Sequence, residues 1–114
     1  MQLLVNNGTA EHYTWGQGCD GWHLLRNAGL SVIEECMPPG TAEVRHHHGM
    51  AQQFFYLLSG TAIMEIEGRI LEMSAGDGAQ VLPGVRHQIR NESKESIRFL
   101  VISQPPSHAD RTND

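Results

Sequence analysis

The sequence predicts an all-β protein, a single domain built as a closed or nearly closed antiparallel β-barrel. Short apolar segments of alternating polarity recur along the 114 residues, and twelve glycines and five prolines separate them. No segment shows helical periodicity with capping residues. Short strands at regular spacing favour a barrel over a helical fold.

The first half of the chain predicts a hairpin that leads into a histidine-bearing strand. Strands at Trp22–Arg26 and Leu30–Met37 flank Asn27–Gly29, which is a favourable hairpin turn. Pro38–Gly40 ends the second strand, because proline cannot donate to a ladder. The chain then enters a strand that contains His46–His48.

The second half predicts a series of further short strands separated by glycine-rich turns. They are expected at Phe54–Leu58, Thr61–Glu67, Arg69–Met73, Ala79–Leu82, Val85–Arg90 and Ser96–Ser103. Pro105 and Pro106 stop the last strand. We therefore expect one domain over residues 1–106, with its core in 22–104, followed by a polar C-terminal tail over 107–114.

Two histidine-bearing segments indicate a metal site. Because side chains alternate faces along a strand, His46 and His48 point to the same side. Gln53 follows a short bend and begins the returning strand, while His87 comes from a separate strand. Three neutral imidazoles and one amide oxygen suit a single divalent transition metal ion (Zn, Ni, Fe, Mn or Cu) with positions open for water or substrate.

The same alternation predicts a largely apolar cup around that ion, which is the usual shape of a small-molecule site. The residues expected to line it are Phe55, Leu57, Met64, Ile89, Tyr13 and Trp15. Further rim contacts are expected from Trp22, His23, Gln52, Gln80 and the tail. The arginines at 45, 86, 90 and 98 fall on the outer face by parity. No obvious acid or base occupies an inward position.

These segments resemble the two motifs of the cupin superfamily. The residues in frame with the motifs are Gly40, His46, His48, Gly60, Gly76, Gly84, His87 and Asn91. Gln53 stands where the family usually has Glu, and Leu82 replaces a proline that here follows as Pro83. The resemblance implies a small single-domain cupin, an RmlC-like jelly roll or double-stranded β-helix, that binds one metal ion.

The glutamine at the fourth ligand position resembles the small cupins that linearise unsaturated uronates in pectin and alginate breakdown. There, an Asp and an Arg near the last strand assist, but Val101 and Ser107 occupy the comparable positions here. The resulting hypothesis is a metal-dependent isomerase of a sugar acid or similar small oxygenated substrate, with the metal as Lewis acid. The catalytic residue is undetermined, and Tyr13, His23 and Glu35 are candidates for the proton carrier.

Two alternatives remain open. A metal-dependent dioxygenase fits three histidines with a neutral fourth ligand, and an apolar cup favours it over a charged sugar. A non-enzymatic ligand-binding or metal-binding module fits the lack of an inward acid or base. Metal identity and oxygen consumption separate the first alternative from an isomerase.

Composition and charge restrict the partners. A net charge of −5 without a basic run argues against nucleic acid, and no segment is long enough to span a membrane. The first residues lack the features of a signal peptide, and the two cysteines form no Cys-x-x-Cys pair, so a cytoplasmic protein is expected. Leu3–Val5 and two tryptophans predict a homodimer.

Overall fold

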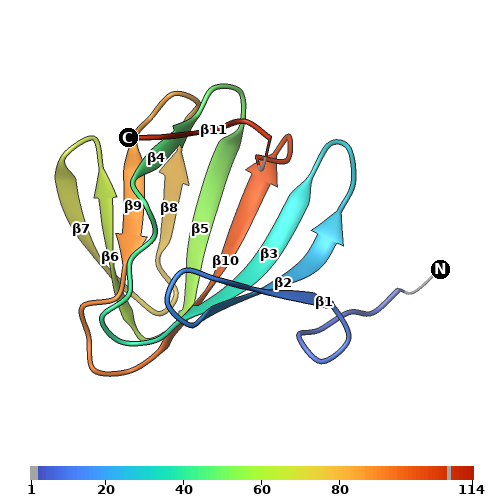
Figure 1. Ribbon diagram of the computed structural model, residues 1–114, viewed down its shortest axis with the longest axis horizontal. Helices are drawn as coiled ribbons and strands as arrows, with labels where there is room; N and C mark the ends of the chain where they lie inside the picture. The colour runs from blue at the N-terminus through green and yellow to red at the C-terminus, as the bar shows by residue number, and fades with distance from the viewer. Residues whose placement is uncertain (1–2, 108) are drawn as a thin grey trace.

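Two antiparallel β-sheets face each other in this computed structural model and enclose the hydrophobic core (Figure 1). The structure describes residues 3–107 and 109–114, so residues 1 and 2 of the expected domain and His108 of the expected tail lie outside the described residues. Within these ranges there are eleven strands and no helix, which confirms the all-β expectation. The same ranges hold no helix that could cross a membrane.

The larger sheet contains six strands in the order β1-β2-β3-β10-β5-β8. Their bounds are β1 (Glu11–Trp15), β2 (Cys19–Arg26), β3 (Ser31–Met37), β10 (Ile97–Gln104), β5 (Gln52–Ser59) and β8 (Gly78–Val81). The first three strands follow one another, but β10 pairs between β3 and β5. This insertion of a distant strand is the crossover that characterises jelly rolls.

The smaller sheet contains five strands in the order β11-β4-β9-β6-β7. Their bounds are β11 (Arg111–Asn113), β4 (His46–His48), β9 (His87–Arg90), β6 (Thr61–Ile66) and β7 (Arg69–Ser74). No named strand is shared between the two sheets in the described residues, so they form the expected jelly roll with two layers. Of the closed or nearly closed barrel that strand spacing predicts, the closed form is not the one observed.

Two strands, β1 and β11, are not predicted by the sequence. Every residue of β11 is exposed, so hydrophobic alternation gives no signal there, and backbone pairing with β4 holds it in place. β1 is held in the same way by its pairing with β2. Residues 107–114, expected as a polar tail, therefore contain a strand that returns to the smaller sheet.

The inward-facing side chains change from apolar to polar along the larger sheet. On β10, Ile97 and Phe99 are fully buried in the core, and Ser103 lies at the other end of the strand opposite Gln53 of β5. The apolar ends fill the space between the sheets. The polar ends leave one end of the interior available for chemistry.

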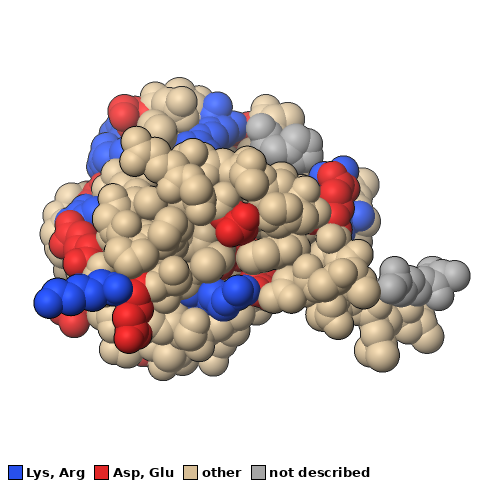
Figure 2. Space-filling view, turned by 60° about the horizontal axis from the view of Figure 1, so that its bottom comes forward, with Lys and Arg blue, Asp and Glu red and all other residues tan. Residues whose placement is uncertain are grey.

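The surface and the N-terminal segment bear on possible partners. Acidic and basic side chains are interspersed on the face in Figure 2, without a basic patch there. The N-terminal segment extends away from the sheets in Figure 1, and Leu3 and Leu4 are 86% and 84% exposed. The homodimer expected from this apolar segment stays a prediction.

Candidate metal centre

Three buried histidines from two neighbouring strands meet inside the jelly roll. β4 directs His46 and His48 inward, and β9 places His87 directly opposite His46 in the ladder. One possible ligand atom from each ring lies within 4.8 Å of those of the other two. The ring centroids of His46 and His87 are 4.4 Å apart. This spacing suits three imidazoles around one ion.

Backbone carbonyls fix the orientation of two of these rings. The Nδ1 of His46 donates to the carbonyl oxygen of Val44 at 2.7 Å, and the Nδ1 of His87 donates to that of Val85 at 3.0 Å. Each donation leaves the Nε2 of the same ring as a lone-pair donor to a metal. Such hydrogen bonds are the usual outer-shell support of metal-binding histidines.

Several buried polar atoms of the cluster have no hydrogen-bond partner among the described residues. They are the Nε2 of His87, the Oε1 of Gln53 and both ring nitrogens of His48, one of which is a lone-pair donor in the neutral ring. The Nε2 of Gln53 donates to the Oγ of Ser103 at 3.0 Å, which turns its oxygen away from that serine. Because unpaired buried polar atoms are costly and three of these atoms can donate a lone pair, a divalent cation at this point fits the residues present.

Burial keeps the imidazoles neutral. It lowers the pKa of His46 to about 3 and that of His48 to about 4, and it lowers the pKa of His87 as well. Removal from water disfavours the charged form of a histidine, which explains the direction. The lone pairs that a metal requires are thus available throughout the neutral pH range.

A cavity of about 220 Å³ opens beside His46 and His48. Its lining comprises Tyr13, Trp15, Ile33, Glu35, Glu43, His46, His48, Gln53, Phe55, Val101, Ser103, Ser107 and Arg111. Of the residues expected to line it, Tyr13, Trp15 and Phe55 do so. Leu57, Met64 and Ile89 do not line it, because they are fully buried in the core.

Two carboxyl groups line the cavity, which corrects the expectation that inward positions hold no acid or base. Glu35 lies on β3, and its Oε2 accepts a hydrogen bond from the hydroxyl of Tyr13 at 3.0 Å. The Oε1 of Glu43 accepts one from the backbone N–H of Ile89 at 3.0 Å. Burial raises the pKa of Glu35 to about 7 and that of Glu43 to about 8. Both carboxyls can therefore carry a proton near neutral pH.

A glycine in β2 allows the tyrosine to reach Glu35. Tyr13 and Gly21 are paired across the β1–β2 ladder. A Cβ atom at Gly21 would lie 2.2 Å from the Cζ of Tyr13, closer than any packed contact allows. The aromatic ring therefore lies across the space that a side chain at position 21 would occupy, and its hydroxyl extends into the cavity.

The C-terminal residues, which were expected to supply rim contacts, place a basic side chain at the cavity. Arg111 of β11 is the only arginine in the lining, and its Nη2 donates to the carbonyl oxygen of Val44 at 3.2 Å. The outward arginine Arg45 instead pairs with Glu65, with Nε and Oε1 2.6 Å apart. The sequence does not predict the strand that carries Arg111, because β11 is too short and polar to give a periodic signal.

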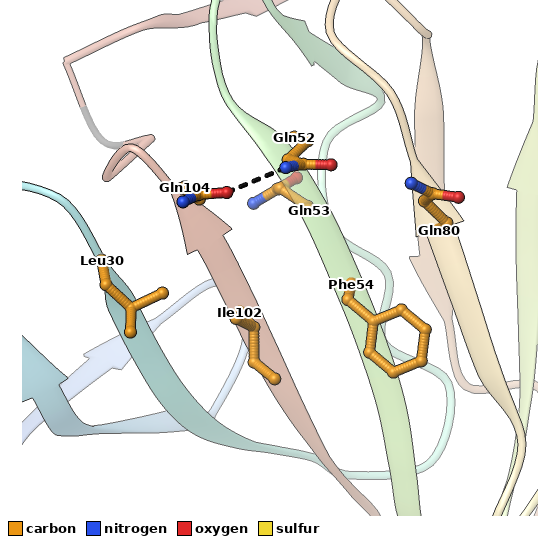
Figure 3. Close-up of a pocket in the computed structure, with 7 residues that line it drawn as sticks. All are labelled: Leu30, Gln52, Gln53, Phe54, Gln80, Ile102 and Gln104. Carbon is orange, nitrogen blue, oxygen red and sulfur yellow. Dashed lines mark hydrogen bonds between the residues drawn. The ribbon is translucent and has the colours of Figure 1, made fainter.

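A larger hollow lies on the outer face of the six-stranded sheet (Figure 3). Its volume is about 450 Å³, and it is lined by Leu30, Gln52, Gln53, Phe54, Gln80, Ile102 and Gln104. Gln52 and Gln80, expected at the rim of the metal cup, lie here, and Gln52 donates to Gln104 at 2.9 Å. None of these lining residues is titratable, so the smaller cavity is the better candidate for chemistry.

Comparisons with known proteins agree with this fold. The sequence is 30% identical over 89 residues to an uncharacterized protein, MJ1618, of Methanocaldococcus jannaschii, covering 77% of this chain and 71% of that one. Three further curated relatives are matched over only 47%, 46% and 54% of their own lengths.

Solved structures share the fold at low sequence identity. KdgF from Halomonas sp. superposes with a TM-score of 0.86 and 16% identity, covering 96% of this chain and 98% of that one. A putative sugar phosphate isomerase from Acidithiobacillus ferrooxidans superposes with a TM-score of 0.75 and 22% identity, covering 90% of this chain and 74% of that one. The family model described as a cupin domain matches residues 33–103. This chain belongs to the cupin family.

Proposed function

We propose that this protein is a metal-dependent enzyme that isomerises a sugar acid or a similar small oxygenated substrate. One observation carries the proposal: a single cavity is lined by unpaired metal-ligating atoms, by a carboxyl with a pKa near neutrality and by an arginine. Isomerisation needs a polarised oxygen and a group that both gives and takes a proton.

The side chains of the cavity divide these tasks. Arg111 pairs with the carboxylate of the substrate, since a guanidinium matches that group by charge and by hydrogen-bond geometry. Glu35 transfers the proton, and the hydroxyl of Tyr13 holds its carboxyl in place. When bound by His46, His48, His87 and Gln53, a divalent ion supplies Lewis-acid polarisation of a substrate oxygen.

The cavity also offers an acid and an arginine in place of the two that the uronate-linearising cupins use, which supports the proposed isomerase. Val101 and Ser107, at the positions comparable to their Asp and Arg, do line the cavity but can neither transfer a proton near neutral pH nor bind a carboxylate by charge. Glu35 and Arg111 offer both functional groups from other strands of the same cavity. The similarity to a putative sugar phosphate isomerase supports an isomerase without identifying its substrate.

The test uses unsaturated galacturonate and unsaturated guluronate with protein loaded with Zn, Ni or Mn. We expect the ultraviolet absorbance of the conjugated substrate to decay faster than in buffer, and chelator-treated protein serves as the control. Decay at the buffer rate with every metal and both substrates would contradict the proposal.

The apolar part of the cavity favours a metal-dependent dioxygenase as the second candidate. Trp15, Ile33, Phe55 and Val101 present aromatic and aliphatic surface beside three neutral imidazoles. Oxygen uptake by the Fe-loaded or Cu-loaded protein with diketone or catechol substrates would favour this activity. Absence of both activities would favour a non-enzymatic binding module. The argument for that module was the lack of an inward acid or base, and Glu35 and Glu43 weaken it.

A further inference from the structure

We propose that Asp110 is a positioning residue for the metal centre and holds the turn between two ligand-bearing strands in its metal-binding geometry. The inference rests on the proposed metal site. The turn, residues 49–51, joins β4, which ends at His48, to β5, which carries Gln53 at its second position. A shift of this turn therefore moves two proposed ligands at once.

The carboxylate of Asp110 binds every backbone N–H of that turn. Its Oδ1 accepts from Gly49 at 3.1 Å, and its Oδ2 accepts from Met50 at 2.8 Å and from Ala51 at 2.9 Å. These donors hold the pKa of Asp110 below its ordinary value, so the group is ionised at neutral pH. Hydrogen bonds to an ionised acceptor are about twice as strong as neutral ones.

Packing does little to hold the middle of the turn. The side chain of Met50 is 73% exposed, and Gly49 is exposed as well. A loop with few buried contacts opens readily unless hydrogen bonds fix it. Ala51 is buried and holds one end of the turn by packing, so we assign the fixed geometry of the exposed residues Gly49 and Met50 to the Asp110 carboxylate.

The position of Asp110 is itself set by the ligand strand. β11 follows directly and pairs with β4, with Arg111 opposite His48 and Asn113 opposite His46. At the far end of β11, the carboxylate of Asp114 accepts from the Nδ1 of His47 at 2.8 Å. The C-terminal segment thus pairs with β4 along its whole length, and Asp110 adds hydrogen bonds to the turn that leads to β5.

The charge of Asp110 acts in the same direction. The Oδ1 of Asp110 lies 3.1 Å from the backbone nitrogen of Gly49, the residue that follows His48, so the negative charge lies close to a proposed ligand. A negative charge near the ligand set also favours a bound cation. Position and charge therefore both predict weaker metal binding when Asp110 is changed.

The test compares the zinc affinity of the full chain with that of Asp110→Asn, by competition with a chromophoric chelator. Loss of an outer-shell partner lowers metal affinity by about 10- to 100-fold in other proteins, and we expect a loss in that range. Hydrogen exchange at Gly49, Met50 and Ala51 should become faster. Asp77→Asn is the matched control, because Asp77 accepts from the N–H of Ser74 at 2.8 Å in a turn at the other end of the molecule (Figure 1).

A second variant separates position from charge and serves if Asp110→Asn does not fold. Asp110→Glu retains the charge but displaces the carboxylate, so positioning predicts reduced zinc affinity. Wild-type affinity in Asp110→Glu, or in a folded Asp110→Asn, would overturn the positioning role alone. A wild-type protein that takes up no zinc or other transition metal would overturn the proposed function together with this inference.

Discussion

Burial has opposite effects on the pKa values of the ionisable groups in the two walls of the cavity. The wall formed by the smaller sheet is called here the histidine wall. His46 and His48 line the cavity there, the ring of His87 lies 4.4 Å from that of His46, and burial keeps all three neutral. The wall formed by β1 and β3, called here the acid wall, carries Tyr13 and Glu35, and burial keeps the carboxyl protonated up to about pH 7. Loss of hydration thus prepares one wall to bind a cation and the other to supply a proton.

The largest expected effect comes from breaking the histidine wall. His48→Ala removes one of three ligands that lie within 4.8 Å of one another, so protein purified without added metal should lose its transition metal. Elemental analysis should find about one ion per wild-type chain and almost none in the variant.

The neighbouring histidine provides the control. His47 lies on the same strand but bonds to Asp114 on the outer side, so His47→Ala should retain the metal. Equal metal content in wild type and His48→Ala would remove the histidine wall from the proposed function.

Glu35→Gln breaks the acid wall and should leave metal content unchanged. If Glu35 transfers the proton, kcat should fall by about 10²- to 10⁴-fold, the usual contribution of a general acid or base. Steady-state kinetics on the substrate that the wild type accepts give this ratio. Glu34→Gln is the control, since Glu34 faces the outer side and pairs with Arg98 at 2.7 Å. A variant at position 35 with wild-type kcat would exclude the acid wall from proton transfer.

The sequence predicts the histidine wall well and the acid wall poorly. Strand parity alone places His46 and His48 on one side, because their spacing of two residues lies within one strand. Tyr13 and Glu35 come together only through the pairing of three strands, and no spacing rule records that contact. Long-range pairing, rather than local pattern, determines this part of the site.

The fold follows the same division. Alternation predicts β10 within one residue of each end, since its buried and exposed positions alternate along the strand. The short exposed strand β11 leaves no such pattern, so the sequence predicts a tail near the rim but not the strand that places Arg111 there. The set of residues expected to line the cavity also included some that lie in the core, such as Leu57. Strand parity predicts which side a residue faces, but it does not predict whether that residue borders a cavity or packed side chains.

Arg111 interacts electrostatically with both walls, and its removal should have an intermediate effect. Its charge lowers the pKa of Glu35 and also lowers that of His46. If it binds the carboxylate of the substrate, Arg111→Ala should raise KM by about 10- to 100-fold, in line with about 1.5–3 kcal/mol for a charged hydrogen bond. Arg98→Ala is the control on the outer face. A KM unchanged from wild type would show that the substrate does not use this cation.

The smallest effects are expected in the pH dependence of stability of the metal-free protein. The folded pKa of His48, about 4, lies below the usual value of 6.5, so the unfolded state binds more protons and stability falls as pH drops from 6.5 to 4. The folded pKa of Glu35, about 7, lies above the usual 4.5, so stability falls as pH rises from 4.5 to 7.

Denaturant unfolding of metal-free protein between pH 4 and 8 measures both effects. Relative to wild type, Glu35→Gln should become progressively more stable as pH rises from 4.5 to 7. In this range the wild type releases the proton of Glu35 when it unfolds, which favours unfolding, whereas glutamine has no such proton. His48→Ala should gain stability relative to wild type as pH falls from 6.5 to 4, because it lacks the imidazole that takes up a proton on unfolding. A difference between wild type and Glu35→Gln that does not vary with pH would contradict the raised pKa of Glu35.

The single hydrogen atom that serves as the side chain of Gly21 has a consequence for redesign of the cavity. A methyl group there would displace the ring of Tyr13, because its carbon would lie 2.2 Å from the Cζ of that ring. The hydroxyl would then withdraw from Glu35, although no lining residue had changed identity. Mutant libraries restricted to the residues that line the cavity would overlook position 21, which determines where the ring of Tyr13 lies.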